Sequence, residues 1–229
     1  MGSFLENVLF PQYCPLCGAK TSTESGLCSS CCDRLPFIGE RSCIRCGRPL
    51  GYEGYCVSCV SSSRSEGWSI RRFLFRYDDI MAHLIHLMKY KGDRALLRFF
   101  ARELGAFFER VYAVSPPAAV VPVPLSVKRE RQRGFNQARE LSRFLPLPVE
   151  QNYLKRVKNT KPQSVFSETA HRRKNVQEAF RASGDVKGRY LLLVDDIVTS
   201  GATAEEAAKT LKRAGAKRVD VMALCLARS

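Results

Sequence analysis

Two adjacent carboxylates and a short polar loop form the part of this 229-residue chain best suited to bind a phosphorylated sugar. Asp195 and Asp196 follow the apolar run 191–194, and the loop after them contains Thr199, Ser200, Gly201, Ala202 and Thr203. Backbone amides of such a loop, at the start of a helix, converge on a phosphate with the help of the helix dipole. The two acids repel phosphate but suit ribose hydroxyls, a bound Mg²⁺ or a developing positive charge. The pattern therefore predicts a site for a phosphorylated sugar rather than for phosphate alone.

A dense cationic cluster lies earlier in the chain and comprises Lys128, Arg129, Arg131 and Arg133. If these residues lie on a helix, Arg129 and Arg133 share one face, so the four side chains cannot all point into one pocket. Three interpretations stay open for the cluster: a solvated helix face, a site for a leaving pyrophosphate, and a contact surface for nucleic acid.

Nine of the ten cysteines precede residue 60, and eight of them form Cys-x-x-Cys pairs: Cys14/Cys17, Cys28/Cys31, Cys43/Cys46 and Cys56/Cys59. Two such turns supply the tetrahedral set of four thiolates that Zn²⁺ prefers. The first and third pairs are 29 residues apart and the second and fourth are 28 apart, which favours tandem units with one structural zinc each. A cross-braced pairing, and Cys32 in place of Cys31, stay open. A disulfide framework is disfavoured because nothing else indicates export.

Charge divides the chain unequally. The formal net charge is +15, of which residues 1–64 carry +1 and residues 65–229 carry +14. A composition of 45% hydrophobic and 26% charged residues excludes a wholly disordered chain. No apolar run approaches the roughly 20 residues that a membrane-spanning helix needs. Residues 4–10 are too few and too polar for a secretory signal, so we expect a cytoplasmic protein.

The elements that must position these residues alternate between strand and helix through the second part of the chain. We expect strands at 68–77, 118–121, 190–194 and 219–226, and helices at 78–91, 96–107, 128–144 and 203–214. This order predicts an α/β domain with a mostly parallel sheet flanked by helices. The acids and the loop would then lie at the carboxyl end of a strand, where ligands bind in open α/β sheets. A polar linker at 61–65 divides a small zinc-ribbon module, 1–64, from the α/β domain, 65–229.

Segment 191–203 closely resembles the signature of type I phosphoribosyltransferases, which bind 5-phosphoribosyl-1-pyrophosphate (PRPP). Every position of the pattern hydrophobic-Asp-Asp-hydrophobic-Thr-Ser-Gly-x-Thr is matched. The resemblance implies that the loop holds the 5′-phosphate, that Asp195 and Asp196 face the ribose as the catalytic pair, and that Mg²⁺ accompanies PRPP.

The flanking segments resemble the ComF family. Val121-Pro122-Val123-Pro124-Leu125 and the basic cluster look like that family's pyrophosphate-binding region, segment 89–93 also fits, and four cysteine pairs precede the domain. The resemblance implies a flexible loop with Arg156, Gln163 and Arg172. It also implies the handling of single-stranded DNA in natural transformation, with PRPP and single-stranded DNA as ligands and a helicase among the partners.

The charge of the second domain is an independent reason to expect nucleic acid, because Lys and Arg displace counterions from a phosphate backbone. The alternative is an active phosphoribosyltransferase of nucleotide metabolism or salvage. The complete loop pattern favours turnover, but nothing in the sequence names the acceptor, so enzymatic activity stays open.

Overall fold

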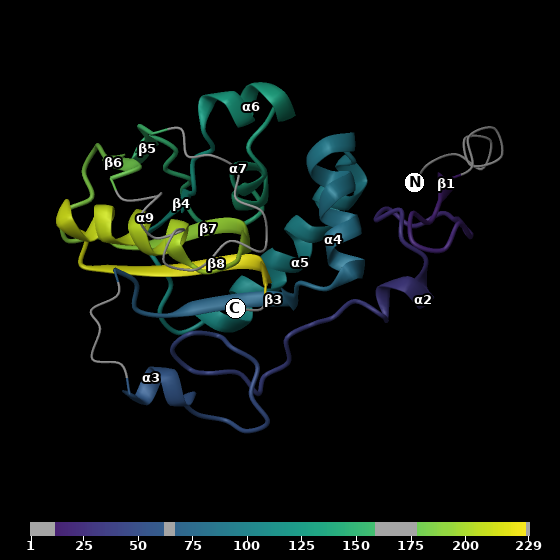
Figure 1. The fold of residues 1–229 in the computed structure, drawn as a ribbon, viewed down its shortest axis with the longest axis horizontal. Coiled ribbons are helices and arrows are strands. Elements are labelled where there is room, and N and C mark those ends of the chain that lie inside the picture. Colours follow the sequence, from purple (N-terminus) through teal and green to yellow (C-terminus); the bar gives the residue numbers. More distant parts are fainter. Residues whose placement is uncertain (1–11, 62–66, 159–177, 228–229) are drawn as a thin grey trace.

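A parallel four-stranded sheet forms the centre of the computed structural model, which describes residues 12–61, 67–158 and 178–227 (Figure 1). The strand order is β3-β8-β7-β4. The bounds are Arg71–Arg76 for β3, Ala119–Pro122 for β4, Tyr190–Val198 for β7 and Arg218–Leu226 for β8. All three neighbouring pairs run parallel. The predicted α/β architecture with a mostly parallel sheet is thus confirmed.

Helices cover both faces of this sheet. On one face α9 (Ala202–Arg213) packs its small side chains against Leu191, Leu193 and Val221. On the other face the helices α4 (Asp79–His86), α5 (Arg94–Tyr112) and α7 (Gln137–Ser142) share a core with Leu192 and Val194. Because successive strand residues point to opposite faces, a strand covered on both sides needs a continuous apolar run. That requirement explains the apolar segment just before Asp195.

The helix predicted over 78–91 begins as α4 and continues as a π-helical turn, η1 (Leu87–Lys91). Gly92, with φ of +66°, ends it in the left-handed conformation that glycine adopts without strain. The carboxylate of Asp93 then accepts hydrogen bonds from the amides of Ala95 and Leu96, both at 3.0 Å, and begins α5. The turn fixes the position of Lys89, which lies within η1.

The single helix predicted over 128–144 is wrong, because the structure contains two. The first, α6, spans Val127–Arg133, and α7 follows it. Gly134 ends α6 in a left-handed conformation, with φ of +76°. The side chain of Asn136 then caps α7 by accepting from the amides of Ala138 and Arg139. The structure also contains a short antiparallel pair of strands that the sequence did not predict. The pair consists of β5 (Leu154–Arg156) and β6 (Phe180–Ala182).

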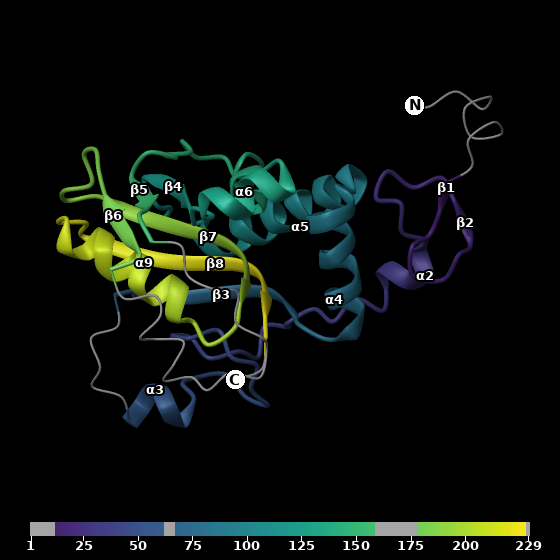
Figure 2. The ribbon, with the colours of Figure 1, turned by 45° about the horizontal axis from the view of Figure 1, so that its top comes forward.

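The two cysteine-rich ribbons pack on different parts of the α/β domain (Figures 1 and 2). The first contains β1 (Gln12–Tyr13), β2 (Lys20–Thr21) and α2 (Ser29–Cys32), and shares a core with α4 and α5. The second ends in α3 (Val57–Ser61) and shares a core with Trp68 and Phe73. In both views α2 lies on the side of α4, whereas α3 lies below β3.

Main-chain hydrogen bonds join the segment between the ribbons to the outer edge of β3. The amide of Ile38 donates to the carbonyl of Leu74, and the amide of Arg76 donates to the carbonyl of Pro36, both at 2.8 Å. An uncovered edge strand would leave such groups unpaired. Among the described residues, no helix is long and apolar enough to cross a membrane.

Candidate functional site

The polar loop lies between the carboxyl end of β7 and the first turn of α9. Gly201 precedes α9 with φ of +79°, a left-handed conformation that residues with a Cβ adopt only with strain. Gly201 has no side chain to cap this helix, and Ser200 Oγ accepts only a long hydrogen bond, 3.4 Å, from the amide of Ala202. Thr199 is exposed, while Ser200 and Thr203 are half-buried and Ala202 is buried. The loop thus presents amides and hydroxyls at a positively polarised helix end, as phosphate binding requires.

The two acids lie near the carboxyl end of β7, separated from this loop by Ile197 and Val198. The amide of Asp196 donates to the Asp195 carboxylate at 2.9 Å. Burial and the neighbouring charge of Asp196 raise the pKa of Asp195 to about 7, although that amide, Lys89 and Arg156 oppose the shift. Asp195 is therefore a carboxyl group whose protonation changes near neutral pH, which is typical of functional sites.

Lys89 is the partner of Asp196. Its Nζ lies 2.6 Å from the Asp196 carboxylate, and the two side chains are only 12% and 13% exposed. The resemblance found in the sequence included segment 89–93 but gave Lys89 no role. One sequence feature could have indicated a role for Lys89. It follows the apolar positions Leu84, Leu87 and Met88, which are at helical spacing, so its ammonium group should lie at the edge of the core.

The four side chains of the basic cluster lie on two faces of α6, as helical spacing requires. On α6, Lys128 and Arg131 are exposed, whereas Arg129 and Arg133 are half-buried. The guanidinium of Arg133 donates to Gln137 at 2.9 Å and to the hydroxyl of Tyr90 at 3.3 Å. The half-buried pair therefore lies toward η1 and the site, and the exposed pair lies toward solvent.

Arg156, at the end of β5, approaches the same edge of the sheet. Burial lowers the pKa of its guanidinium, the charge of Arg129 lowers it further, and Asp195 raises it, so Arg129 and Asp195 each lie near Arg156. Its guanidinium also stacks over Phe180, 5.4 Å from the ring centroid. The other two predicted loop residues, Gln163 and Arg172, lie outside the described residues.

The eight paired cysteines gather into two sequential groups of four. In each group the sulfur atoms lie within 4.8 Å of one another: Cys14, Cys17, Cys28 and Cys31 in the first, and Cys43, Cys46, Cys56 and Cys59 in the second. The arrangement is not cross-braced, and it includes Cys31 rather than Cys32. Sulfur contacts of 3.6 Å are far too long for a disulfide. They match the roughly 3.8 Å that a tetrahedron with Zn–S bonds of about 2.3 Å implies.

One thiol in each group of four cysteines has a lowered pKa. Burial alone would raise the pKa of Cys14 and Cys43, but hydrogen bonds from backbone amides lower it to about 6 in each case. A thiolate is the form that binds zinc. The donor set therefore fits two structural zinc ions.

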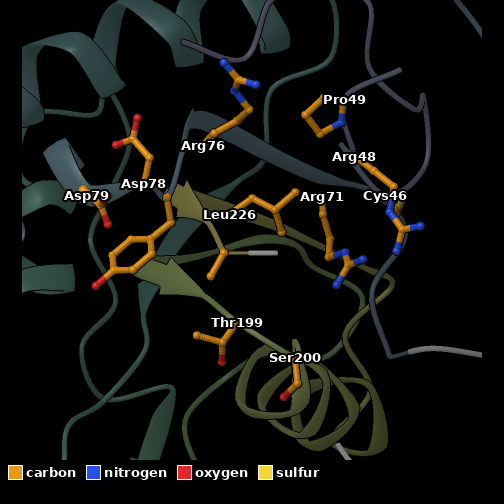
Figure 3. Close-up of a pocket in the computed structure, with 12 residues that line it drawn as sticks. Cys46, Arg48, Pro49, Arg71, Arg76, Asp78, Asp79, Thr199, Ser200 and Leu226 are labelled. Atoms are coloured by element: carbon orange, nitrogen blue, oxygen red, sulfur yellow. The ribbon is translucent and has the colours of Figure 1, made fainter. Parts of the chain in front are cut away.

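A cavity of about 640 Å³ lies between the second ribbon and the polar loop (Figure 3). Its walls come from the ribbon, from β3 and the start of α4, from the loop and from the end of β8. The lining residues are Cys46, Arg48, Pro49, Arg71, Arg76, Tyr77, Asp78, Asp79, Thr199, Ser200, Leu226 and Ala227. The sequence did not predict that the second ribbon adjoins the loop.

Comparisons with known proteins agree with this geometry. The double zinc ribbon domain matches residues 5–60, and the phosphoribosyl transferase domain matches residues 131–229. Competence protein ComFC of Bacillus subtilis (strain 168) is 31% identical over 221 residues, which are 90% of this chain and 85% of the relative. Competence protein F of Haemophilus influenzae is 32% identical, with coverages of 89% and 92%. DNA utilization protein YhgH of Escherichia coli O157:H7 is 31% identical, with coverages of 94% and 97%.

Each relative is matched over most of its own length, so the likeness includes both the ribbons and the α/β domain. The two cysteine groups, the parallel sheet and the acid–loop pattern at the end of β7 are the features that such a two-part protein requires. The chain therefore belongs to the ComF family, with a double zinc ribbon followed by a phosphoribosyltransferase domain.

Proposed function

We propose that this protein binds PRPP with Mg²⁺ at the carboxyl edge of its sheet, binds single-stranded DNA on the adjoining basic surface, and handles that DNA during uptake. The relatives named for competence and DNA utilization support the role in DNA uptake. The same proposal includes a cytoplasmic location, a DNA-processing partner such as a helicase, and a division of the chain after residue 64.

The observation that carries the PRPP site is the loop at the start of α9 directly beside Asp195 and Asp196. Amides at the helix start and the hydroxyls of Thr199, Ser200 and Thr203 would hold the 5′-phosphate. The carboxylates would accept hydrogen bonds from the ribose hydroxyls. Bound Mg²⁺ would neutralise part of the pyrophosphate charge.

The division of the basic cluster supports two anionic ligands. Arg156 lies close to Asp195, Arg129 lies close to Arg156, and the two guanidinium groups would meet the pyrophosphate end of PRPP. Lys128 and Arg131 are exposed on α6 and are placed to meet a polymer that cannot enter a pocket. Arg129 shares α6 with Lys128 and Arg131, and Arg156 lies close to Arg129, so we expect the two ligands to repel each other.

Replacing Gly201 by alanine is expected to weaken PRPP binding about tenfold or more. The new Cβ would be strained at φ of +79° and would lie 2.8 Å from Nη1 of Arg71, so the loop or the Arg71 side chain must shift. Calorimetric titration with PRPP and Mg²⁺ measures the effect. Gly215→Ala is the matched control, because Gly215 has φ of +100° at the other end of α9. Equal affinities of the two variants would contradict the loop assignment.

Separate and combined titrations with PRPP and a single-stranded oligonucleotide test the whole proposal. We expect each ligand to bind alone, and we expect saturating PRPP to lower the affinity for the oligonucleotide. Binding of neither ligand would overturn the proposal. Independent binding of both would keep the two sites but would contradict their closeness on α6.

Phosphoribosyl transfer is the second candidate function. The cavity of about 640 Å³ beside Thr199 and Ser200 favours it, because an acceptor would need a pocket close to the bound phosphoribosyl group. Release of pyrophosphate from PRPP in the presence of Mg²⁺ and candidate acceptors tests this function. PRPP binding without any such release would favour a binding role alone.

A further inference from the structure

Arg71 reaches from the first residue of β3 to the start of α9. Its guanidinium carbon lies 4.3 Å from the centroid of the Trp68 ring, which fixes its direction by a cation–π contact. A Cβ built on Gly201 would lie 2.8 Å from its Nη1, so the guanidinium touches the loop. Figure 3 shows Arg71 between Cys46 and Arg48 of the second ribbon and Ser200 of the loop.

Among the described residues, no carboxylate pairs with the Arg71 guanidinium at the start of α9. The start of α9 carries the positive end of the helix dipole, which repels a cation. Within the described ranges the Nε of Arg71 is also buried without a hydrogen-bond partner. A buried donor without a partner costs free energy, and an anion between the guanidinium and the helix start would satisfy both groups.

We propose that Arg71 binds the anion held by the loop 199–203, and that the second zinc ribbon keeps Arg71 in place. This inference rests on the proposed PRPP function and adds a ligand for the 5′-phosphate that lies outside the loop pattern. It also gives the second ribbon a role in binding that the first ribbon does not share.

The contacts between the second ribbon and Arg71 are made by the backbone. The amide of Arg71 donates to the carbonyl of Arg45 at 2.8 Å. Gly47 packs so closely that a Cβ there would lie 2.6 Å from the Arg71 carbonyl oxygen and 3.0 Å from the Phe73 ring. Arg45 and Gly47 flank Cys46, one of the four cysteines of the second group. Because zinc would fix Cys46, it would also fix the turn on which the Arg71 backbone rests.

The first ribbon offers a matched comparison because it contacts other elements. The imidazole Nε2 of His83 on α4 lies 3.2 Å from the Pro15 carbonyl, and Arg102 on α5 pairs with Glu24. These contacts hold the first ribbon against the helical face of the domain. Loss of its zinc should therefore leave Arg71 undisturbed.

Ribose 5-phosphate is the probe that isolates this contact, since it lacks the pyrophosphate. We expect Arg71→Met to weaken its binding about tenfold, as for the loss of a charged hydrogen bond, and Arg71→Lys to restore part of the affinity. Arg129→Met should weaken PRPP binding without changing the affinity for ribose 5-phosphate. Unchanged affinity of Arg71→Met would overturn the inference alone. Failure of the wild-type protein to bind either ligand would overturn the proposed function and this inference together.

The role of the ribbon is tested by removing one zinc at a time. Cys59→Ser and Cys28→Ser each alter a half-buried cysteine, in the second and first group respectively, and zinc analysis should show one ion lost from each. We expect only Cys59→Ser to weaken ribose 5-phosphate binding. Gly47→Ala, which keeps all eight cysteines, should act in the same direction if Cys59→Ser does not fold. Equal affinities of the Cys28 variant and the second-ribbon variants would overturn the role of the ribbon.

Discussion

Replacing Asp195 and Asp196 together by asparagine is expected to weaken PRPP binding by at least about 100-fold, since each carboxylate contributes charged hydrogen bonds. Both acids lie near the carboxyl end of β7, and both would accept from the ribose hydroxyls. Asparagine keeps the shape of the side chain but removes its charge. Any release of pyrophosphate that the wild-type protein shows should disappear in the double variant.

Calorimetric titration with PRPP and Mg²⁺ measures this loss, and Asp185→Asn is the control because Asp185 is an exposed acid in a weak ion pair with Arg189. Thermal unfolding must accompany the titration, because removing Asp196 leaves Lys89 largely buried without its partner. A folded double variant that binds PRPP as well as the wild-type protein would show that the two acids and Lys89 form only a structural ion-pair cluster.

The pH dependence of binding gives the same variants a second readout. The pKa of Asp195 is raised to about 7, first by burial and then by Asp196, so the ligand-free protein carries a proton there at pH 6. If the ribose is bound by the ionised form, that proton must leave, and binding strengthens as the pH rises through 7. The affinity should be about tenfold higher at pH 8 than at pH 6 from this group. Asp195→Asn retains only the titration of the ligand, so subtracting its profile isolates Asp195.

Local pattern was sufficient for the parts of the site that are contiguous in sequence. The apolar run, the two acids and the loop predicted the end of β7 and the start of α9, because one strand–loop–helix unit contains them all. The cysteine offsets favoured sequential metal groups but could not exclude cross-bracing, since both schemes use the same turns. Only the positions of the sulfur atoms distinguish them.

Prediction from the sequence was wrong or incomplete where a break in a helix, or a contact between residues distant in the chain, determined the structure. The end of α6 could not be predicted from the charged run 128–133, because that run is compatible with a continuous helix. Gly134 ends α6, and Asn136 caps the next helix within three residues of the run. The contacts of Lys89 with Asp196 and of Arg71 with Gly201 join residues that are more distant in the chain. They depend on the strand order β3-β8-β7 and on the packing of α4 and η1, and no single segment encodes that arrangement.

Replacing Lys128 and Arg131 by glutamine is expected to produce a large loss of affinity for single-stranded DNA at low salt, with little change in PRPP binding. Both side chains are exposed on α6, on a domain that carries +14 of the net charge. Each contact to a single-stranded phosphate backbone contributes about 0.7 to the slope of log affinity against log salt. The double variant should therefore lower that slope by about 1.4. With on the order of six contacts, the wild-type affinity would fall about 300-fold between 50 and 200 mM salt.

Lys187→Gln with Lys217→Gln is the control that separates a local surface from net charge. These exposed lysines precede β7 and β8, at the edge of the sheet opposite the loop, and their removal changes the net charge equally. Equal slopes for the two double variants would mean that DNA responds to overall charge and would contradict a site on α6. Arg129→Gln with Arg133→Gln should show the reverse selectivity, with loss of PRPP and a smaller change in slope. If that reversal is found, one short helix serves a polymer with its solvent face and a sugar pyrophosphate with its inner face.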